Sequence, residues 1–160
     1  MLIRDETGCD ADAVYAVVSS AFGRHGEAQL VRDLHVAGDA VVALVAEDDS
    51  HIIGHVLLSR LVAPFPALAL APVSVLPGRQ GTGVGSALVR EALRRAAEGH
   101  WRAVFVLGDP KYYGRFGFST AAAAGFSSPY AGEYFMGLAL SGVMPAATGE
   151  LRHAAAFSAL

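Results

Sequence analysis

The chain is poor in cysteine and lysine and carries no excess of positive charge. Cys9 is its one cysteine, so no disulfide can form within the chain and a cysteine-rich zinc site is excluded. Lys111 is the one lysine among twelve basic residues, and the formal net charge is −3. Because a nucleic-acid backbone is bound mainly by clustered basic residues, we expect no nucleic-acid partner.

Long apolar runs are missing as well. The least polar stretch, residues 61–77, contains four prolines and is shorter than the roughly 20 apolar residues that cross a bilayer. The first twelve residues are acidic and lack the apolar run typical of a signal peptide. We therefore expect a soluble, cytoplasmic protein with no membrane partner.

Apolar residues are abundant, at 53% of the chain against 17% charged residues, which excludes an intrinsically disordered protein. A chain of 160 residues matches one ordinary domain. A domain of this size buries roughly 70% of the surface that its unfolded chain exposes, so it needs no disulfide or metal for stability. We expect a single domain over residues 1–160.

The spacing of apolar residues predicts an α/β fold. Pro72 stands inside one apolar run and indicates a sheet edge, a bulge or a break in the hydrogen-bond ladder. The order of elements predicts a mixed, mostly antiparallel sheet flanked by helices. Helical spacing covers residues 12–22, 27–35, 83–98 and 111–116, and strand patterns cover residues 2–6, 41–47, 52–61, 68–75, 103–107, 134–140 and 150–157.

A glycine-rich turn stands between the strand 68–75 and the helix 83–98. Three glycines in five residues let the backbone approach a ligand closely. The helix that follows presents unpaired N–H groups and the positive end of its dipole. Together these features are typical of a phosphate-binding site. The turn reads Gln80-Gly81-Thr82-Gly83-Val84-Gly85-Ser86.

Other interpretations of this turn stay open on the residues alone. A P-loop requires lysine and then serine or threonine after its last glycine, but Ser86 and Ala87 stand there. A dinucleotide fingerprint requires glycine or alanine where Ser86 stands. Its acidic residue, expected roughly 20 positions on, would be Asp109, which comes late. A plain loop before a helix is the third alternative.

The turn and its surroundings resemble the GCN5-related N-acetyltransferase (GNAT) superfamily. The family signature Arg/Gln-x-x-Gly-x-Gly/Ala corresponds to Gln80–Gly85, and its tyrosine four residues before a Gly-Phe pair corresponds to Tyr113 before Gly117-Phe118. The two blocks stand in the family's order. Segments 26–31, 70–75 and 107–110 further resemble the YhbS-like branch of predicted acetyltransferases, so the similarity runs almost end to end.

The resemblance implies a twisted sheet that splays between its fourth and fifth strands and binds acetyl-coenzyme A there. Asp109 stands where many members have asparagine. Its carboxylate would bind the pantetheine arm or the acceptor, or would cap the short helix that follows. The residues implied to bind the cofactor are Val73, Ser74 and Val75 along the pantetheine arm and Gln80, Gly81, Thr82, Gly83, Val84, Gly85 and Ser86 at the pyrophosphate.

The reaction implied is direct transfer of an acetyl group to a primary amine of a small molecule or peptide, without a metal. Tyr113 would protonate the departing thiolate, with the adjacent Tyr112 as the alternative. The general base is left open among Glu27, His55 and Glu133. The other histidines lack metal-ligand spacing and are interpreted as surface or packing residues: His25, His35, His51, His100 and His153.

A function of a different class stays open beside the enzyme. It is a catalytically weak module that binds acyl-coenzyme A and regulates a partner. Release of free thiol from acetyl-coenzyme A in the presence of amines would separate the two. The sequence specifies neither the acceptor amine nor whether the protein forms a homodimer.

Overall fold

The computed structural model describes residues 1–160 and divides the chain into two units. The first unit comprises residues 1–59, 71–92 and 155–160, and the second comprises residues 60–70 and 93–154. Two strands and one helix of the chain contribute to both units, because the boundaries fall within them.

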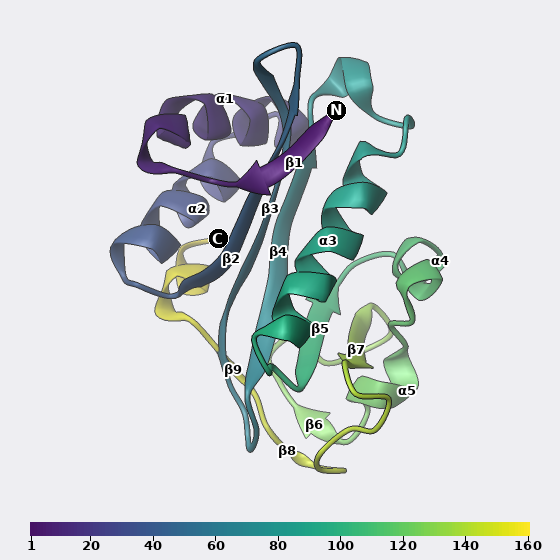
Figure 1. Cartoon of the computed structure of the whole chain (residues 1–160). Helices are drawn as coiled ribbons and strands as arrows, with labels where there is room; N and C mark the ends of the chain where they lie inside the picture. Colours follow the sequence, from purple (N-terminus) through teal and green to yellow (C-terminus); the bar gives the residue numbers. More distant parts are fainter. The chain divides into compact units, whose positions relative to one another are not determined.

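Most elements follow the predicted hydrophobic pattern with small shifts at their ends (Figure 1). The helices are α1 (Ala11–Phe22), α2 (Gly26–Val36), α3 (Val84–Glu98), α4 (Pro110–Tyr113) and α5 (Thr120–Ala123), with 3-10 turns at Gly8–Asp10, Pro77–Arg79, Gly114–Phe116 and Ala155–Ala159. The strands are β1 (Leu2–Asp5), β2 (Ala40–Asp48), β3 (His51–Val62), β4 (Ala67–Val75), β5 (Ala103–Leu107), β6 (Phe126–Ser127), β7 (Phe135–Ala139), β8 (Gly149–Glu150) and β9 (Arg152–His153).

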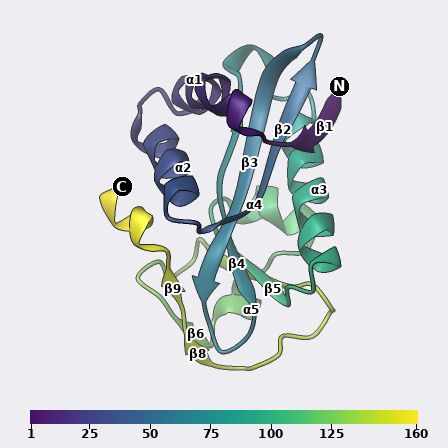
Figure 2. The same cartoon turned by 60° about the vertical axis from the view of Figure 1, so that its left-hand side comes forward.

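The first unit is an antiparallel set of strands with helices on both faces. β1 pairs with β2 and β2 pairs with β3, each pair antiparallel. Figures 1 and 2 show α1 and α2 on one face of these strands and α3 on the other. Contacts agree with this view, because a Cβ on Gly54 of β3 would lie 2.9 Å from the Leu88 side chain of α3.

The second unit contains the parallel pair of the sheet. β4 pairs with β5 in parallel, and β5 pairs with β7 in antiparallel orientation. The β4–β5 ladder ends at Ala69 and Phe105, although β4 continues to Val75. The expected mixed, mostly antiparallel sheet is therefore confirmed, and the ladder between its fourth and fifth strands is short.

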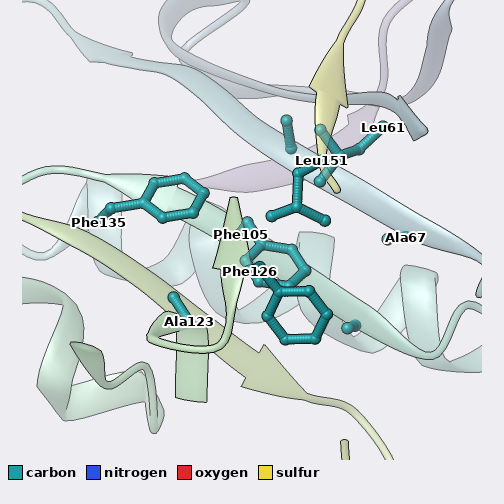
Figure 3. Packing of buried hydrophobic residues seen from close by; sticks show 9 residues of the cluster. Leu61, Ala67, Phe105, Ala123, Phe126, Phe135 and Leu151 are labelled. Atoms are coloured by element: carbon teal, nitrogen blue, oxygen red, sulfur yellow. The ribbon is translucent and has the colours of Figure 1, made fainter. Parts of the chain in front are cut away.

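Aromatic side chains make up the centre of the second unit. Figure 3 shows Phe105, Phe126 and Phe135 gathered with Leu61 and Leu151. The rings of Phe105 and Phe126 meet edge to face at 5.4 Å, and those of Phe105 and Phe135 stack at 5.8 Å. Such pairs add to the burial of apolar area, so this cluster gives the second unit its own hydrophobic core.

One expectation about local structure was wrong. The strand predicted over 150–157 is only β8 and β9, followed by a 3-10 turn. Three alanines at 154–156 explain the early end, since alanine is disfavoured in strands. The expectation for Pro72 was a sheet edge, a bulge or a break in the ladder, and the β4–β5 ladder ends at Ala69, before Pro72, although β4 itself runs through that residue. The short helix α5 was not predicted; Ser119 caps it by accepting a hydrogen bond from the Ala122 N–H at 3.1 Å.

No helix in the chain is both long enough and apolar enough to cross a membrane.

Candidate functional site

The turn between β4 and α3 keeps space open around two of its glycines. Gly81 has φ of 76° and Gly83 has φ of 91°, a left-handed conformation that glycine adopts without steric cost. A Cβ at either position would meet no atom within 4 Å. The turn therefore presents bare main chain to an approaching ligand.

The polar side chains of the turn form hydrogen bonds to backbone groups of the same loop and stabilise its shape. Gln80 donates from Nε2 to the Val75 carbonyl at 3.0 Å, and Thr82 donates from its hydroxyl to the Arg79 carbonyl. Arg79 pairs with Asp48 at 2.7 Å and lowers the pKa of that carboxyl below its usual range. These contacts fix the loop shape and leave ligand contact mainly to the backbone.

The N-terminus of α3 completes this part of the site. Its first intrahelical bond runs from the Ala87 N–H to the Gly83 carbonyl at 3.0 Å. No acidic side chain lies in the first turn of the helix to offset the positive end of its dipole. The arrangement favours an anion against the backbone around Gly81 and Gly83.

The end of β4 runs toward this turn within the same unit. Val73 and Val75 are half-buried, whereas Ser74 is buried with its hydroxyl lacking a hydrogen-bond partner. The strand is held on its β3 side, where the Leu76 N–H donates to the Ile53 carbonyl at 2.9 Å.

Tyr113 ends helix α4 in the second unit and is 9% exposed. Its ring packs against Phe118 and edge to face against Tyr112. Burial, with a smaller contribution from Tyr112, raises the pKa of Tyr113 to about 12. The phenol is therefore fully protonated at neutral pH and has a proton to give.

Gly108 makes room for this ring. A Cβ on Gly108 would lie 2.5 Å from Cε2 of Tyr113, closer than two such atoms can approach. The sequence analysis did not single out Gly108 as a packing position. The one sequence feature that could have drawn attention to Gly108 is its place directly before Asp109, the residue that caps α4.

Asp109 and Tyr112, the other two residues singled out near Tyr113 in the sequence, each have a structural partner. The Asp109 carboxylate accepts a hydrogen bond from the Lys111 N–H at 2.9 Å and so caps α4. This contact matches the capping alternative for Asp109. Tyr112 lies under the guanidinium of Arg115, 4.5 Å from its ring centroid.

The three candidate bases differ in environment. Glu27, in the first turn of α2, is 7% exposed and bound by Arg24 at 2.9 and 2.5 Å, which lowers the pKa of the carboxyl. His55 on β3 is fully buried, and its Nε2 lies 2.6 Å from Oε1 of Glu6. Glu133 is exposed on the segment before β7.

Sequence reasoning missed the partners of His55. Glu6 was expected only as the end of the first strand and His35 only as a surface or packing residue. In the structure, His35 lies 3.1 Å from Glu6 on the opposite carboxylate oxygen from His55. No local pattern could reveal this cluster, because Glu6 and His55 are 49 positions apart.

The chain has no group of three or more histidine, cysteine, aspartate or glutamate side chains placed to hold a metal ion.

The fold and the glycine turn define an acetyltransferase of the GNAT type. Residues 39–120 match the model of the acetyltransferase (GNAT) domain, and the chain belongs to this family. The match includes the glycine turn and Tyr113, so the resemblance found in the sequence is confirmed.

One relative, YhbS of Escherichia coli, is similar to this chain both in sequence and in structure. The "Uncharacterized N-acetyltransferase YhbS" of Escherichia coli K12 is 39% identical over 126 residues, which are 76% of this chain and 75% of that protein. A crystal structure of Escherichia coli YhbS in complex with CoA matches with a TM-score of 0.88 and 33% identity, over 98% of this chain and 91% of that chain.

A third similarity is to a GNAT family acetyltransferase of Brucella melitensis, solved in complex with acetyl-CoA. It matches with a TM-score of 0.84 and 34% identity, over 98% of this chain and 97% of that chain.

Proposed function

We propose that residues 1–160 form one acyltransferase domain that moves an acetyl group from acetyl-coenzyme A directly to a primary amine of a small molecule or peptide. The observation that carries the proposal is the open backbone at Gly81 and Gly83 before the N-terminus of α3. The pyrophosphate would accept hydrogen bonds from main-chain amides between Gln80 and Ser86.

The pantetheine arm would lie along the end of β4. Its amides would pair with the backbone of Val73–Val75 as an added strand does. Support comes from the short β4–β5 ladder, which ends at Ala69 while β4 continues. The complexes of YhbS with CoA and of the Brucella protein with acetyl-CoA support the same choice of cofactor.

Tyr113 is the proposed general acid. A departing thiolate needs a proton, and a phenol whose pKa is raised to about 12 holds one at neutral pH. The proposed base is Glu27 or His55. The ion pair with Arg24 lowers the pKa of Glu27 and so counts against it as a proton acceptor.

The test measures cofactor binding and turnover separately. Calorimetry with coenzyme A gives the affinity, and a thiol reagent follows coenzyme A release from acetyl-coenzyme A with a panel of primary amines. Release that depends on an amine, with the acetylated amine identified by mass spectrometry, supports the enzyme. Tight binding with no turnover across the panel supports the acyl-coenzyme A-binding regulatory module and overturns the proposal.

A further inference from the structure

A carboxylate between two histidines lies on the face of the first unit that α1 and α2 cover. Glu6 directly follows β1 and is 7% exposed at its side chain. Its Oε1 lies 2.6 Å from Nε2 of His55, and its Oε2 lies 3.1 Å from Nε2 of His35. A cavity of about 400 Å³, with Arg32 and Tyr15 on its wall, reaches Glu6 and His35 but not His55.

The charge of Glu6 determines which nitrogen of His55 carries hydrogen. Burial alone would raise the pKa of Glu6, but the hydrogen bonds from His35 and His55 outweigh it and lower that pKa to about 2. An ionised carboxylate only accepts hydrogen bonds. Nε2 of His55 must therefore be the donor, and Nδ1 is the nitrogen that accepts whenever the ring carries a single hydrogen.

Nδ1 of His55 is buried and has no hydrogen-bond partner. The ring itself is 0% exposed. Nearly all buried polar atoms in proteins have partners, so an open acceptor calls for an explanation. An imidazole whose other nitrogen is held by an ionised carboxylate is the arrangement of a general base that waits for its proton donor.

The position of His55 fits that role. The hydrogen bond between Leu76 and Ile53 sets β3 beside the end of β4, and a Cβ on Gly54 would lie 3.2 Å from the Ser74 carbonyl. Side chains alternate along a strand, so His55 stands one residue on, directed to the opposite face from Gly54. His55 thus belongs to the strand that neighbours the segment proposed to hold the thioester arm.

We propose that His55 is the general base of the acetyl transfer and that Glu6 and His35 position it. This inference rests on the proposed function. As the amine nitrogen bonds to the thioester carbonyl carbon, it gives up a proton that passes through water to Nδ1 of His55. The C–S bond then breaks, and the thiolate takes the proton of Tyr113.

The remaining groups keep this step balanced. Glu6 stays ionised and offsets the charge of the imidazolium, while His35 occupies its second oxygen and prevents the carboxylate from turning away. After the product leaves, His55 returns its proton to water and Tyr113 regains one from water.

A measurement without any substrate tests the geometry. Nitrogen-15 NMR of the imidazole rings in the whole protein at pH 7.5 should find His55 with a hydrogen on Nε2 and none on Nδ1. A protonated Nδ1 in the wild type overturns the proposal.

Kinetics test the role with acetyl-coenzyme A and the amine of highest turnover. His55→Gln and Glu6→Gln should each lower kcat about 100-fold or more, while the Kd for coenzyme A changes less than threefold. Glu6→Asp, which keeps the carboxylate, should lose less. His51→Gln, at the exposed start of the same strand, is the matched control and should match the wild type.

The outcomes separate the two proposals. If the wild type acetylates an amine and His55→Gln keeps kcat within a factor of three, the assignment of the base fails and the proposed function stands. If the wild type binds coenzyme A but releases no thiol with any amine, both fail. Thermal melting identifies variants that do not fold, and the tautomer of His55 in the wild type then decides.

Discussion

The two units of the molecule use glycine in opposite ways. In the first unit, Gly81 and Gly83 keep space empty, since a Cβ on either would meet nothing within 4 Å. In the second unit, the space beside Gly108 is filled, since a Cβ there would lie 2.5 Å from the ring of Tyr113. Empty space beside a backbone suits a ligand, whereas filled space fixes a side chain.

The comparison extends to the polar groups of each unit. The first unit contributes main-chain amides and the cluster around Glu6, whereas the second contributes one phenol, Tyr113, set among aromatic rings. On the proposed function, the first unit would bind the cofactor and the second would supply the acid. Variants that separate binding from turnover are therefore the sharpest tests.

The largest effect is expected for Tyr113→Phe, which keeps the ring and removes its proton. General acid catalysis contributes roughly 10²–10⁴-fold, or about 3–5 kcal/mol, so kcat should fall by that factor. The Kd for coenzyme A and the melting temperature should hardly change, because the buried ring remains. Steady-state kinetics on an amine for which chemistry limits turnover gives the result.

Tyr112→Phe is the matched control for that variant and should be nearly silent. A kcat of Tyr113→Phe within a factor of three of the wild type would remove Tyr113 from the mechanism. A loss in Tyr112→Phe instead would assign the acid to the neighbour.

The next effect is expected for Gly83→Ala, which places a methyl group in the open space of the turn. Losing one hydrogen bond to a phosphate oxygen costs about 1.5–3 kcal/mol, so the Kd for coenzyme A should rise roughly 10- to 100-fold. Gly38→Ala is the matched control, since Gly38 has φ of 77° and open space but lies outside the turn. Calorimetry showing equal affinity in both variants would contradict the phosphate site.

The sequence was sufficient to predict the parts of the fold that local pattern controls. The amphipathic helix α3, the apolar strands β2–β5 and the turn at Gly81–Gly83 each carry their signal in adjacent residues. The strand expected over 150–157 failed because alternation there was weak and three alanines ended it early. Helix α5 was missed because four residues give too little periodicity to detect.

The residues of the candidate site likewise fall into those that a local sequence pattern reveals and those that it does not. The glycine turn was singled out from its own residues, and Tyr113 was singled out because its motif resembles that of the GNAT family. The partners of His55 were not, because Glu6, His35 and His55 come from three separate segments that only the tertiary fold brings together. Contacts between distant segments leave no local trace in one sequence.

A smaller effect, on stability, is expected for Gly108→Ala. The added methyl overlaps the ring of Tyr113, and overpacking of this kind costs about 1–3 kcal/mol. Urea denaturation should show a lower midpoint with an unchanged slope. Gly114→Ala in the same unit is the matched control, because its Cβ would meet nothing within 4 Å. Equal stability of the two variants would mean that the ring of Tyr113 can move aside.

The smallest expected effect is on the pH dependence of the free energy of unfolding. The titratable groups that control it differ between the two units. In the second unit, burial lowers the pKa of His153 to about 4, and its ring packs edge to face on Tyr130 at 4.7 Å. In the first unit, the hydrogen bond from His35 to Glu6 raises the pKa of His35, and the pKa of Glu6 is lowered to about 2. The three groups therefore affect folding over different ranges of pH.

The folded and unfolded states bind different numbers of protons, and this difference determines whether stability rises or falls with pH. The contribution of Glu6 is complete above its unfolded pKa of 4.5, and that of His35 is complete below its unfolded pKa of 6.5. Between these values only His153, of the three, changes its contribution, because the unfolded chain takes up a proton that the folded state resists. The free energy of unfolding should fall as pH drops from 6.5 to 4.5, by roughly 1–2 kcal/mol after allowance for solvent screening.

His153→Phe keeps an aromatic ring beside Tyr130 and should flatten this slope, whereas His51→Phe at an exposed position should preserve it. Urea denaturation at several pH values measures the slope, and an unchanged slope in His153→Phe would mean that burial of His153 does not govern the acid sensitivity of the fold.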